Sequence, residues 1–219
     1  MMEPTAFSSE KLGAAHLYAF ILDAKALGAY ALEYNSSSAK YHMAGSWHGR
    51  KDPYGKHMLA ADVNALDGNE HAEQTFFRDK LLPHAKAHGL AVTCGLGKYR
   101  VPAHSIGDGL HFHVDIGRWS NLGEIPGSTG YRVPWVGKPT TQPWAVLAFQ
   151  KKVGGLAVDG INGKETTKAL QKKMGVTADG IIGPETAKAI QKKVGTYVDG
   201  ILGPDTYYAL SAWVEAGCK

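Results

Sequence analysis

The octapeptides DGINGKET (159–166), DGIIGPET (179–186) and DGILGPDT (199–206) follow one another at a constant spacing of 20 residues. An Asp-Gly pair is typical of a tight turn, because the carboxylate accepts backbone N–H groups and glycine readily adopts a positive φ. Pro184 and Pro204 occupy a position that tolerates the missing N–H at the start of a helix. The repeats therefore predict turn–helix units in which most Asp and Thr residues shape the loops.

Each predicted helix carries two apolar residues four positions apart, which defines one buried face. These residues are Leu170 and Met174, Ile190 and Val194, and Leu210 and Val214. Gly154, Gly175 and Gly195 follow the predicted helices, where a left-handed C-terminal cap favours glycine. A single unit buries too little surface to fold alone, so we expect a small all-α domain of three repeats over 144–219. The preceding segment, 127–143, is rich in Pro and Gly and is the expected linker.

The part of the chain before the linker, 1–126, has the mixed pattern of an α+β domain. Ser8 or Ser9 is a suitable N-cap for a first helix. A second helix is expected over 70–88, with a kink at Pro83. Three extended runs surround this second helix and predict a small antiparallel sheet with flanking helices; they are 59–64, 90–96 and 110–117.

Composition excludes several classes of protein. The chain has 219 residues, 44% of them hydrophobic, and a net charge of +4. Basic and acidic residues alternate without a long basic block, so we expect no nucleic-acid binding. Cys94 and Cys218 lack a C-x-x-C partner and indicate neither a disulfide framework nor a thiolate zinc site. Because the sequence has neither an apolar stretch of about 18 residues nor a secretory signal pattern, we expect no membrane insertion. We also expect a monomer.

Ten histidines occur, and all but His16 lie between His42 and His113. Successive side chains of a strand alternate between its two faces, so a strand at HFHVD would point His111, His113 and Asp115 to one side. Two imidazoles on one strand face form a candidate zinc locus. The alternative is a half-exposed strand whose histidines only face solvent.

Two further motifs precede the second predicted helix. SWH (46–48) supplies His48, and AADVN (60–64) supplies Asp62, so one more imidazole and one carboxylate are available. The histidines of the second helix, His71, His84 and His88, are expected on its exposed side.

SWH, AADVN and HFHVDIG resemble the S-x-H, A-x-D and H-x-H signatures of zinc peptidases of the hedgehog/D-alanyl-D-alanine peptidase superfamily, which cut the peptide stems of bacterial cell walls. The resemblance implies that His48, Asp62 and His113 bind Zn²⁺ and leave a fourth position for water. Fourteen positions separate His48 from Asp62, twice the seven of the usual motif. His57 is therefore a rival ligand.

The resemblance also implies a general base close to the last zinc ligand. In that family the base is commonly an acidic residue three positions before the final His, which is Leu110 here. Asp108 would be the base if His111 were the ligand. His111 would be the base by analogy with relatives that use the first His of H-x-H. Both residues remain candidates.

The repeats are similar to the peptidoglycan-binding domain that accompanies many wall hydrolases. The two resemblances together imply a phage endolysin, a zinc peptidase made in the host cytoplasm without a signal peptide that acts on the cell wall after release. Its expected partner is bacterial peptidoglycan and its expected cofactor is Zn²⁺. Two alternatives remain, a zinc N-acetylmuramoyl-L-alanine amidase and a non-catalytic wall-binding protein.

Overall fold

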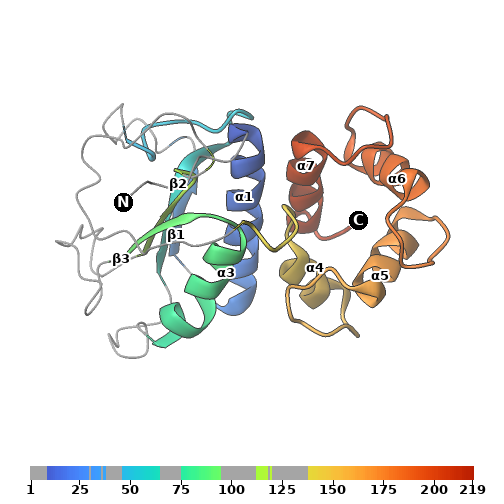
Figure 1. Cartoon of the computed structure of the whole chain (residues 1–219), viewed down its shortest axis with the longest axis horizontal. Helices are drawn as coiled ribbons and strands as arrows, with labels where there is room; N and C mark the ends of the chain where they lie inside the picture. Colours follow the sequence, from blue (N-terminus) through green and yellow to red (C-terminus); the bar gives the residue numbers. More distant parts are fainter. Residues whose placement is uncertain are drawn as a thin grey trace.

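The computed structural model describes residues 9–29, 31–35, 37, 46–64, 75–94, 112–117, 119 and 138–219. Within these residues the chain forms six α-helices, one π-helical turn and a four-stranded antiparallel sheet, which confirms the predicted α+β class. Figure 1 shows the strands on one side of helix α1 (Glu10–Leu27) and the helices of the repeats on the other. None of the described helices is both long and apolar enough to cross a bilayer.

Helix α1 is central to the arrangement. The Ser9 hydroxyl accepts a hydrogen bond from Leu12 N at 3.3 Å, so Ser9 is the N-cap. Gly28 ends the helix with a φ of 115°. Every residue over 13–24 is buried, including those on what would be the solvent face of an ordinary amphipathic helix. Helix α1 therefore requires packing partners on both sides.

The sheet has the strand order β1-β2-β4-β3, and all neighbours are antiparallel. The three expected strands are present as β2 (His57–Asn64), β3 (Ala91–Cys94) and β4 (Phe112–Asp115). The fourth, β1 (Ala31–Asn35), was not expected from the sequence. It is short and pairs with β2 about 30 residues later along the chain, a contact that local pattern does not reveal.

The register of β2 and β4 separates an apolar face from a polar face. Val63 lies opposite Phe112, and both belong to the hydrophobic core that also contains residues of α1. Phe77 stacks on Phe112 with ring centroids 3.9 Å apart. Asp62 lies opposite His113, and alternation places this polar pair on the other face of the sheet.

The second predicted helix is present over 75–87, and its predicted start over 70–74 lies outside the described residues. Its first two described residues are α-helical, and they are followed by a π-helical turn, η2 (Phe77–Leu81), and by α3 (Leu82–Ala87). Leu82 N donates to Phe77 O, five residues earlier. Pro83 follows directly and has no N–H for the usual α-helical bond, so the π turn occurs where the regular ladder is interrupted.

The expectation that the histidines of this helix face solvent was wrong for the two described residues. His88 is completely buried, and the His84 side chain is only 13% exposed. Both are turned toward α1, where Phe20 lies near each ring. His71 lies outside the described residues. The error arose because the sequence does not show that α1 covers this face of the helix.

The repeats form four helices, which are α4 (Val146–Val153), α5 (Lys164–Met174), α6 (Pro184–Val194) and α7 (Pro204–Glu215). The two prolines are the first residues of α6 and α7, as predicted. Gly175 and Gly195 are left-handed C-caps, also as predicted. Gly154 has a φ of 71° but a ψ of 166°, so the chain leaves α4 in an extended direction and the predicted left-handed cap was wrong there.

A buried glutamine holds each Asp-Gly loop. The Gln171 amide donates to Asp179 Oδ1 at 2.7 Å and to Ile181 O at 2.9 Å, and its oxygen accepts from Gly180 N at 2.8 Å. Asp179 also accepts from Ile181 N at 2.8 Å, which confirms its predicted role in the turn. Equivalent bonds to the first and third loops come from Gln150 and Gln191.

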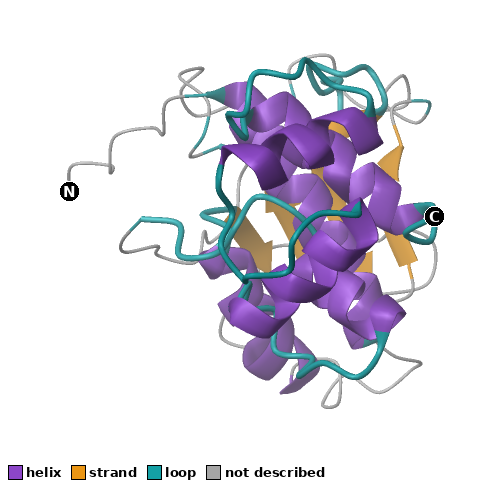
Figure 2. Ribbon diagram, turned by 90° about the vertical axis from the view of Figure 1, so that its right-hand side faces the viewer, coloured by secondary structure: helices purple, strands orange, loops and turns teal. Residues whose placement is uncertain are grey.

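The predicted interior of the repeats is confirmed, but it is not closed on itself. Leu170, Ile190 and Leu210 are buried in one cluster. The same cluster contains Tyr18 and Leu22 of α1. Figure 2 shows the repeat helices in front of the strands when the molecule is viewed from the repeat side. Helix α1 thus contributes to two cores, one shared with the sheet and one with the repeats.

Candidate metal site

His48 lies in a tight turn between β1 and β2. The Ser46 hydroxyl accepts a hydrogen bond from Gly49 N at 3.0 Å, and Ser46 O accepts a second from the same N–H at 3.1 Å. Trp47 is buried in the core of the sheet. Leu59 N donates a hydrogen bond to Arg50 O at 3.1 Å, which connects the end of the turn to β2. The hydrogen bonds of Ser46 and the burial of Trp47 therefore fix the backbone of the turn, and with it the position of His48.

The sheet register brings the other two predicted ligands to this turn. Asp62 of β2 and His113 of β4 are directly opposite each other. His48 Nε2, Asp62 Oδ1 and His113 Nδ1 lie at the corners of a triangle in which all three edges measure 3.0 Å. The side chains of His48 and Asp62 are 9% and 7% exposed, whereas that of His113 is 24% exposed. The triangle is thus accessible from the His113 side.

Asp115 orients the imidazole of His113. The two residues are two positions apart on β4 and share a face, as the sequence predicted. Asp115 Oδ2 lies 3.2 Å from His113 Nε2, and Asp115 Oδ1 accepts from Gly117 N at 2.7 Å. With Nε2–H donated to Asp115, the lone pair of His113 is on Nδ1, the atom that faces the triangle. A carboxylate in this position is a common partner of a metal-binding histidine.

The electrostatics of the triangle favour a positive charge at its centre. Burial alone would raise the pKa of Asp62, but hydrogen bonds with His113 and His48 lower it well below its usual value. Burial alone would lower the pKa of His113, but hydrogen bonds to Asp115 and Asp62 raise it to about 9. The carboxylate is therefore ionised, and a proton or a cation is the natural counter-charge.

The donor set fits a metal ion. Ligand atoms about 2.0–2.1 Å from a tetrahedral zinc lie roughly 3.3–3.4 Å from one another, close to the observed edges. One proton lies along one edge only, so linear hydrogen bonds cannot satisfy all three edges at once. His48, Asp62 and His113 form one of two His/Asp groups, among the residues that the structure describes, that are close enough to hold a cation. A metal site at this position is consistent with the chemistry of the ligands.

The rival ligand His57 lies elsewhere. It is the first residue of β2, five positions before Asp62, and an odd separation places the two side chains on opposite faces of the strand. His57 Nδ1 contacts the hydroxyl of Tyr208 in α7, and its ring lies against that of Tyr18 in α1. Asp52 Oδ2 is 3.6 Å away. His57 is thus part of the contact between the sheet, α1 and α7.

The two predicted bases, Asp108 and His111, lie outside the described residues. Sequence reasoning overlooked the polar cluster around His57, in which the Tyr208 hydroxyl donates to Asp52 Oδ2 at 2.6 Å. No local motif could have revealed it, because Tyr208 lies 156 positions after Asp52 and 151 positions after His57. The glutamines of the repeats were also overlooked, although Gln-Lys-Lys recurs at 150, 171 and 191 and was available as a signal.

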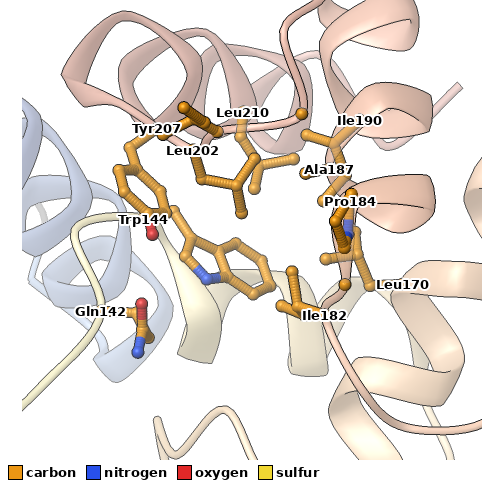
Figure 3. Close-up of a pocket in the computed structure, with 13 residues that line it drawn as sticks. Gln142, Trp144, Leu170, Ile182, Pro184, Ala187, Ile190, Leu202, Tyr207 and Leu210 are labelled. Carbon is orange, nitrogen blue, oxygen red and sulfur yellow. The ribbon is translucent and has the colours of Figure 1, made fainter.

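A second feature with a defined shape lies in the repeats. A pocket of about 450 Å³ opens between the repeat helices and is lined mainly by apolar side chains. Figure 3 shows Trp144 and Tyr207 on one side of the pocket and Leu170 and Ile190 on the other. Among the described residues that line it, most are apolar, which suits this pocket to binding an apolar group.

Comparison of the chain with protein families, with curated proteins and with solved structures finds no match.

Proposed function

We propose that the protein is a zinc metallopeptidase that hydrolyses an amide bond in the stem peptides of bacterial peptidoglycan. The observation that carries the proposal is the triangle of His48 Nε2, Asp62 Oδ1 and His113 Nδ1, with its 3.0 Å edges. These three residues are the ones that the S-x-H, A-x-D and H-x-H signatures specify. A ligand set of two imidazoles and one carboxylate is typical of hydrolytic zinc sites, which keep one position for water.

The residues of the chain have distinct roles in this proposal. His48 and His113 would offer neutral nitrogens, and Asp62 would offer an ionised carboxylate. Asp115 would keep the His113 ring in place. Zinc at this position would lower the pKa of a water molecule toward about 7 and polarise the scissile carbonyl. Asp108 or His111 would accept the proton of that water.

The repeats would attach the enzyme to the wall. Ile161, Ile181 and Ile201 occupy the same position in the three loops and are 65%, 67% and 71% exposed, although large apolar side chains are usually buried. The Asp and Gln side chains of the loops are already engaged with the backbone, so they are less available to a ligand. The isoleucines, and the apolar pocket beside Trp144, are better candidates for contact with peptidoglycan.

Digestion of purified peptidoglycan tests the reaction. We expect the full-length protein to release fragments cut within the stem peptide, as identified by mass spectrometry. Removal of metal with a chelator should abolish the reaction, and added Zn²⁺ should restore it. The variant His48→Ala should lose both metal and activity, whereas His57→Gln should retain zinc.

The outcomes separate the alternatives. Release of intact stem peptides would identify an N-acetylmuramoyl-L-alanine amidase. Wall binding without any metal-dependent cleavage would identify a non-catalytic wall-binding protein.

The general base is tested in the same assay. One of the two variants Asp108→Asn and His111→Gln lacks the base. That variant should hydrolyse peptidoglycan about 10²–10⁴-fold more slowly while zinc stays bound. Both variants at wild-type rate would contradict the assignment of either residue as the base.

A further inference from the structure

Helix α3 and its C-cap carry a second pair of histidines with the spacing of metal ligands. His84 and His88 are four residues apart, so their side chains share one face of the helix. This spacing recurs in helical zinc sites, where both imidazoles reach the same ion. The ring centroids of the two residues lie 4.8 Å apart.

A carboxylate from a different element completes the group. Asp23 of α1 places Oδ2 at 3.1 Å from His84 Nε2. Asp23 is 1% exposed, and its side chain faces the interior between α1 and α3. One ligand atom from each of Asp23, His84 and His88 lies within 4.8 Å of the other two. Two imidazoles and one carboxylate form the same donor set as the triangle on the other face of the sheet.

The environment of His88 favours a cation over a simple hydrogen-bond network. His88 Nδ1 lies 3.0 Å from Nδ1 of His16, so that nitrogen is engaged. His88 Nε2 is fully buried and has no hydrogen-bond partner among the described residues. A buried polar atom without a partner is destabilising and calls for an explanation. A cation on Nε2 would provide it, with Nδ1–H donated to His16.

The two buried histidines of this region, His16 and His88, are neutral at neutral pH. Burial lowers the pKa of His16 to about 3. Burial lowers the pKa of His88 well below its usual value, and charge repulsion from the nearby His84 and His16 lowers it further. His88 therefore keeps a lone pair for a metal ion at neutral pH, and the neutral His16 ring can accept the Nδ1–H of His88. The ring of His16 is held in place by Trp119, with centroids 4.7 Å apart.

The group lies where the sheet region meets the repeats. Asp23 Oδ1 accepts a hydrogen bond from Ala148 N at 2.8 Å, in the first turn of α4. A Cβ added at Gly160, in the first repeat loop, would lie 3.7 Å from His84 Cε1. One carboxylate thus joins the histidines of α3 to the first helix of the repeats.

We propose that Asp23, His84 and His88 form a second, structural site for a transition-metal ion of the Zn²⁺ class. The ion would join α1 to α3 directly beside the contact of α1 with α4. The site is buried and separate from the candidate site at His48, and it would stabilise the junction without taking part in hydrolysis. The proposal does not depend on the function proposed above.

Metal content of the full-length protein tests the proposal. The protein is stripped with a chelator, loaded with excess ZnCl₂, passed through a desalting column and assayed by mass spectrometry for zinc per chain. We expect two equivalents in the wild type, one in His48→Ala, one in His84→Gln and none in the double variant. Asp23→Asn should also lose one equivalent, because Asn keeps an oxygen for Ala148 N but lacks the charge. Asp79→Asn, on the exposed side of the neighbouring π turn, is the matched control and should keep two.

A stability measurement supports the count and does not rely on activity. Zn²⁺ should raise the Tm of stripped His48→Ala by more than about 3 °C and should leave the Tm of the double variant unchanged. Near-UV circular dichroism verifies that each variant is folded. A single equivalent that is lost in His48→Ala and kept in His84→Gln would overturn the proposal. A single equivalent that is lost in His84→Gln and kept in His48→Ala would uphold it while contradicting the proposed catalytic zinc.

Discussion

Asp115 acts on the candidate metal site through His113. Its Oδ2 lies 3.2 Å from His113 Nε2, the ring nitrogen on the side away from the triangle. Loss of such a carboxylate partner typically weakens metal affinity by about 10–100-fold. We therefore expect Asp115→Asn to bind zinc about 10–100-fold more weakly in competition with a chromophoric chelator. The amide oxygen of Asn can still accept from Gly117 N, so the turn after β4 should be retained.

The control for Asp115→Asn is a carboxylate of similar size on the surface. Asp79 forms an exposed ion pair with Arg78, and Asp79→Asn should leave zinc affinity unchanged. Equal affinity in Asp115→Asn and in the wild type would mean that His113 is oriented by other contacts. Loss of folded structure in Asp115→Asn would instead assign this fully buried residue a structural role.

The helix–loop unit of the repeats depends on one glutamine in each copy. Gln171 is 1% exposed and connects the end of α5 to the backbone and to Asp179 of the next loop. Its removal takes away the hydrogen bonds that the glutamine makes with Ile181 O, Gly180 N and the buried Thr186 hydroxyl, and loss of a buried hydrogen-bond partner costs about 1–3 kcal/mol. We expect Gln171→Ala to lower the free energy of unfolding by about 1–3 kcal/mol, as measured by urea denaturation.

Two neighbouring variants make this test specific. Lys172→Ala alters an exposed residue of the same helix and should change stability by less than about 0.5 kcal/mol. Gln171→Glu keeps the acceptor for Gly180 N but places a second carboxylate beside Asp179, so it should be no more stable than Gln171→Ala. Wild-type stability in Gln171→Ala would show that the loop holds its shape without the glutamine.

The whole molecule is organised around α1, whose adjacent residues enter different cores. Ile21 packs in the core of the sheet, and Leu22 packs in the core of the repeats. A buried aliphatic residue replaced by alanine typically costs about 2–5 kcal/mol. We expect one calorimetric unfolding transition, shifted to lower temperature by Ile21→Ala and by Leu22→Ala alike, because α1 cannot leave one core without disturbing the other.

The contrary outcome is equally clear. Two transitions, with each variant lowering only one of them, would show that the sheet region and the repeats unfold independently. The exposed ion pair between Lys168 and Glu165 on α5 provides a control, since Lys168→Ala should leave the transition essentially in place.

Local pattern in the sequence was sufficient for much of the fold. The prolines at 184 and 204 have no N–H and can begin a helix, and the Asp-Gly pairs favour a turn, so the repeat units followed from residue chemistry alone. An N-cap at Ser8 or Ser9 followed in the same way, and the structure has Ser9. The strand β1 did not follow, because it depends on pairing with β2, which the sequence does not identify. The missing N–H of Pro83 predicted a kink, and the structure has a π turn there.

The candidate site shows the same division. The motifs singled out His48, Asp62 and His113, and strand alternation could have placed His57 on the opposite face from Asp62. The register of β2 and β4 decided that the three atoms converge within 3.0 Å, since a shift of one residue would have sent His113 to the other face.

The sequence by itself determined the repeat units, the class of secondary structure and the residue types that can hold a metal ion. These features depend on backbone conformation and side-chain chemistry, which act over a few residues. Only the tertiary structure decided that α1 is shared by two cores, that His57 contacts α7 and that Asp23 meets His84 and His88. Those contacts join residues that are far apart in the chain, such as Asp23 and His84, 61 positions apart, and Tyr18 and Glu215, 197 positions apart. They form because buried surfaces must find partners that local sequence does not name.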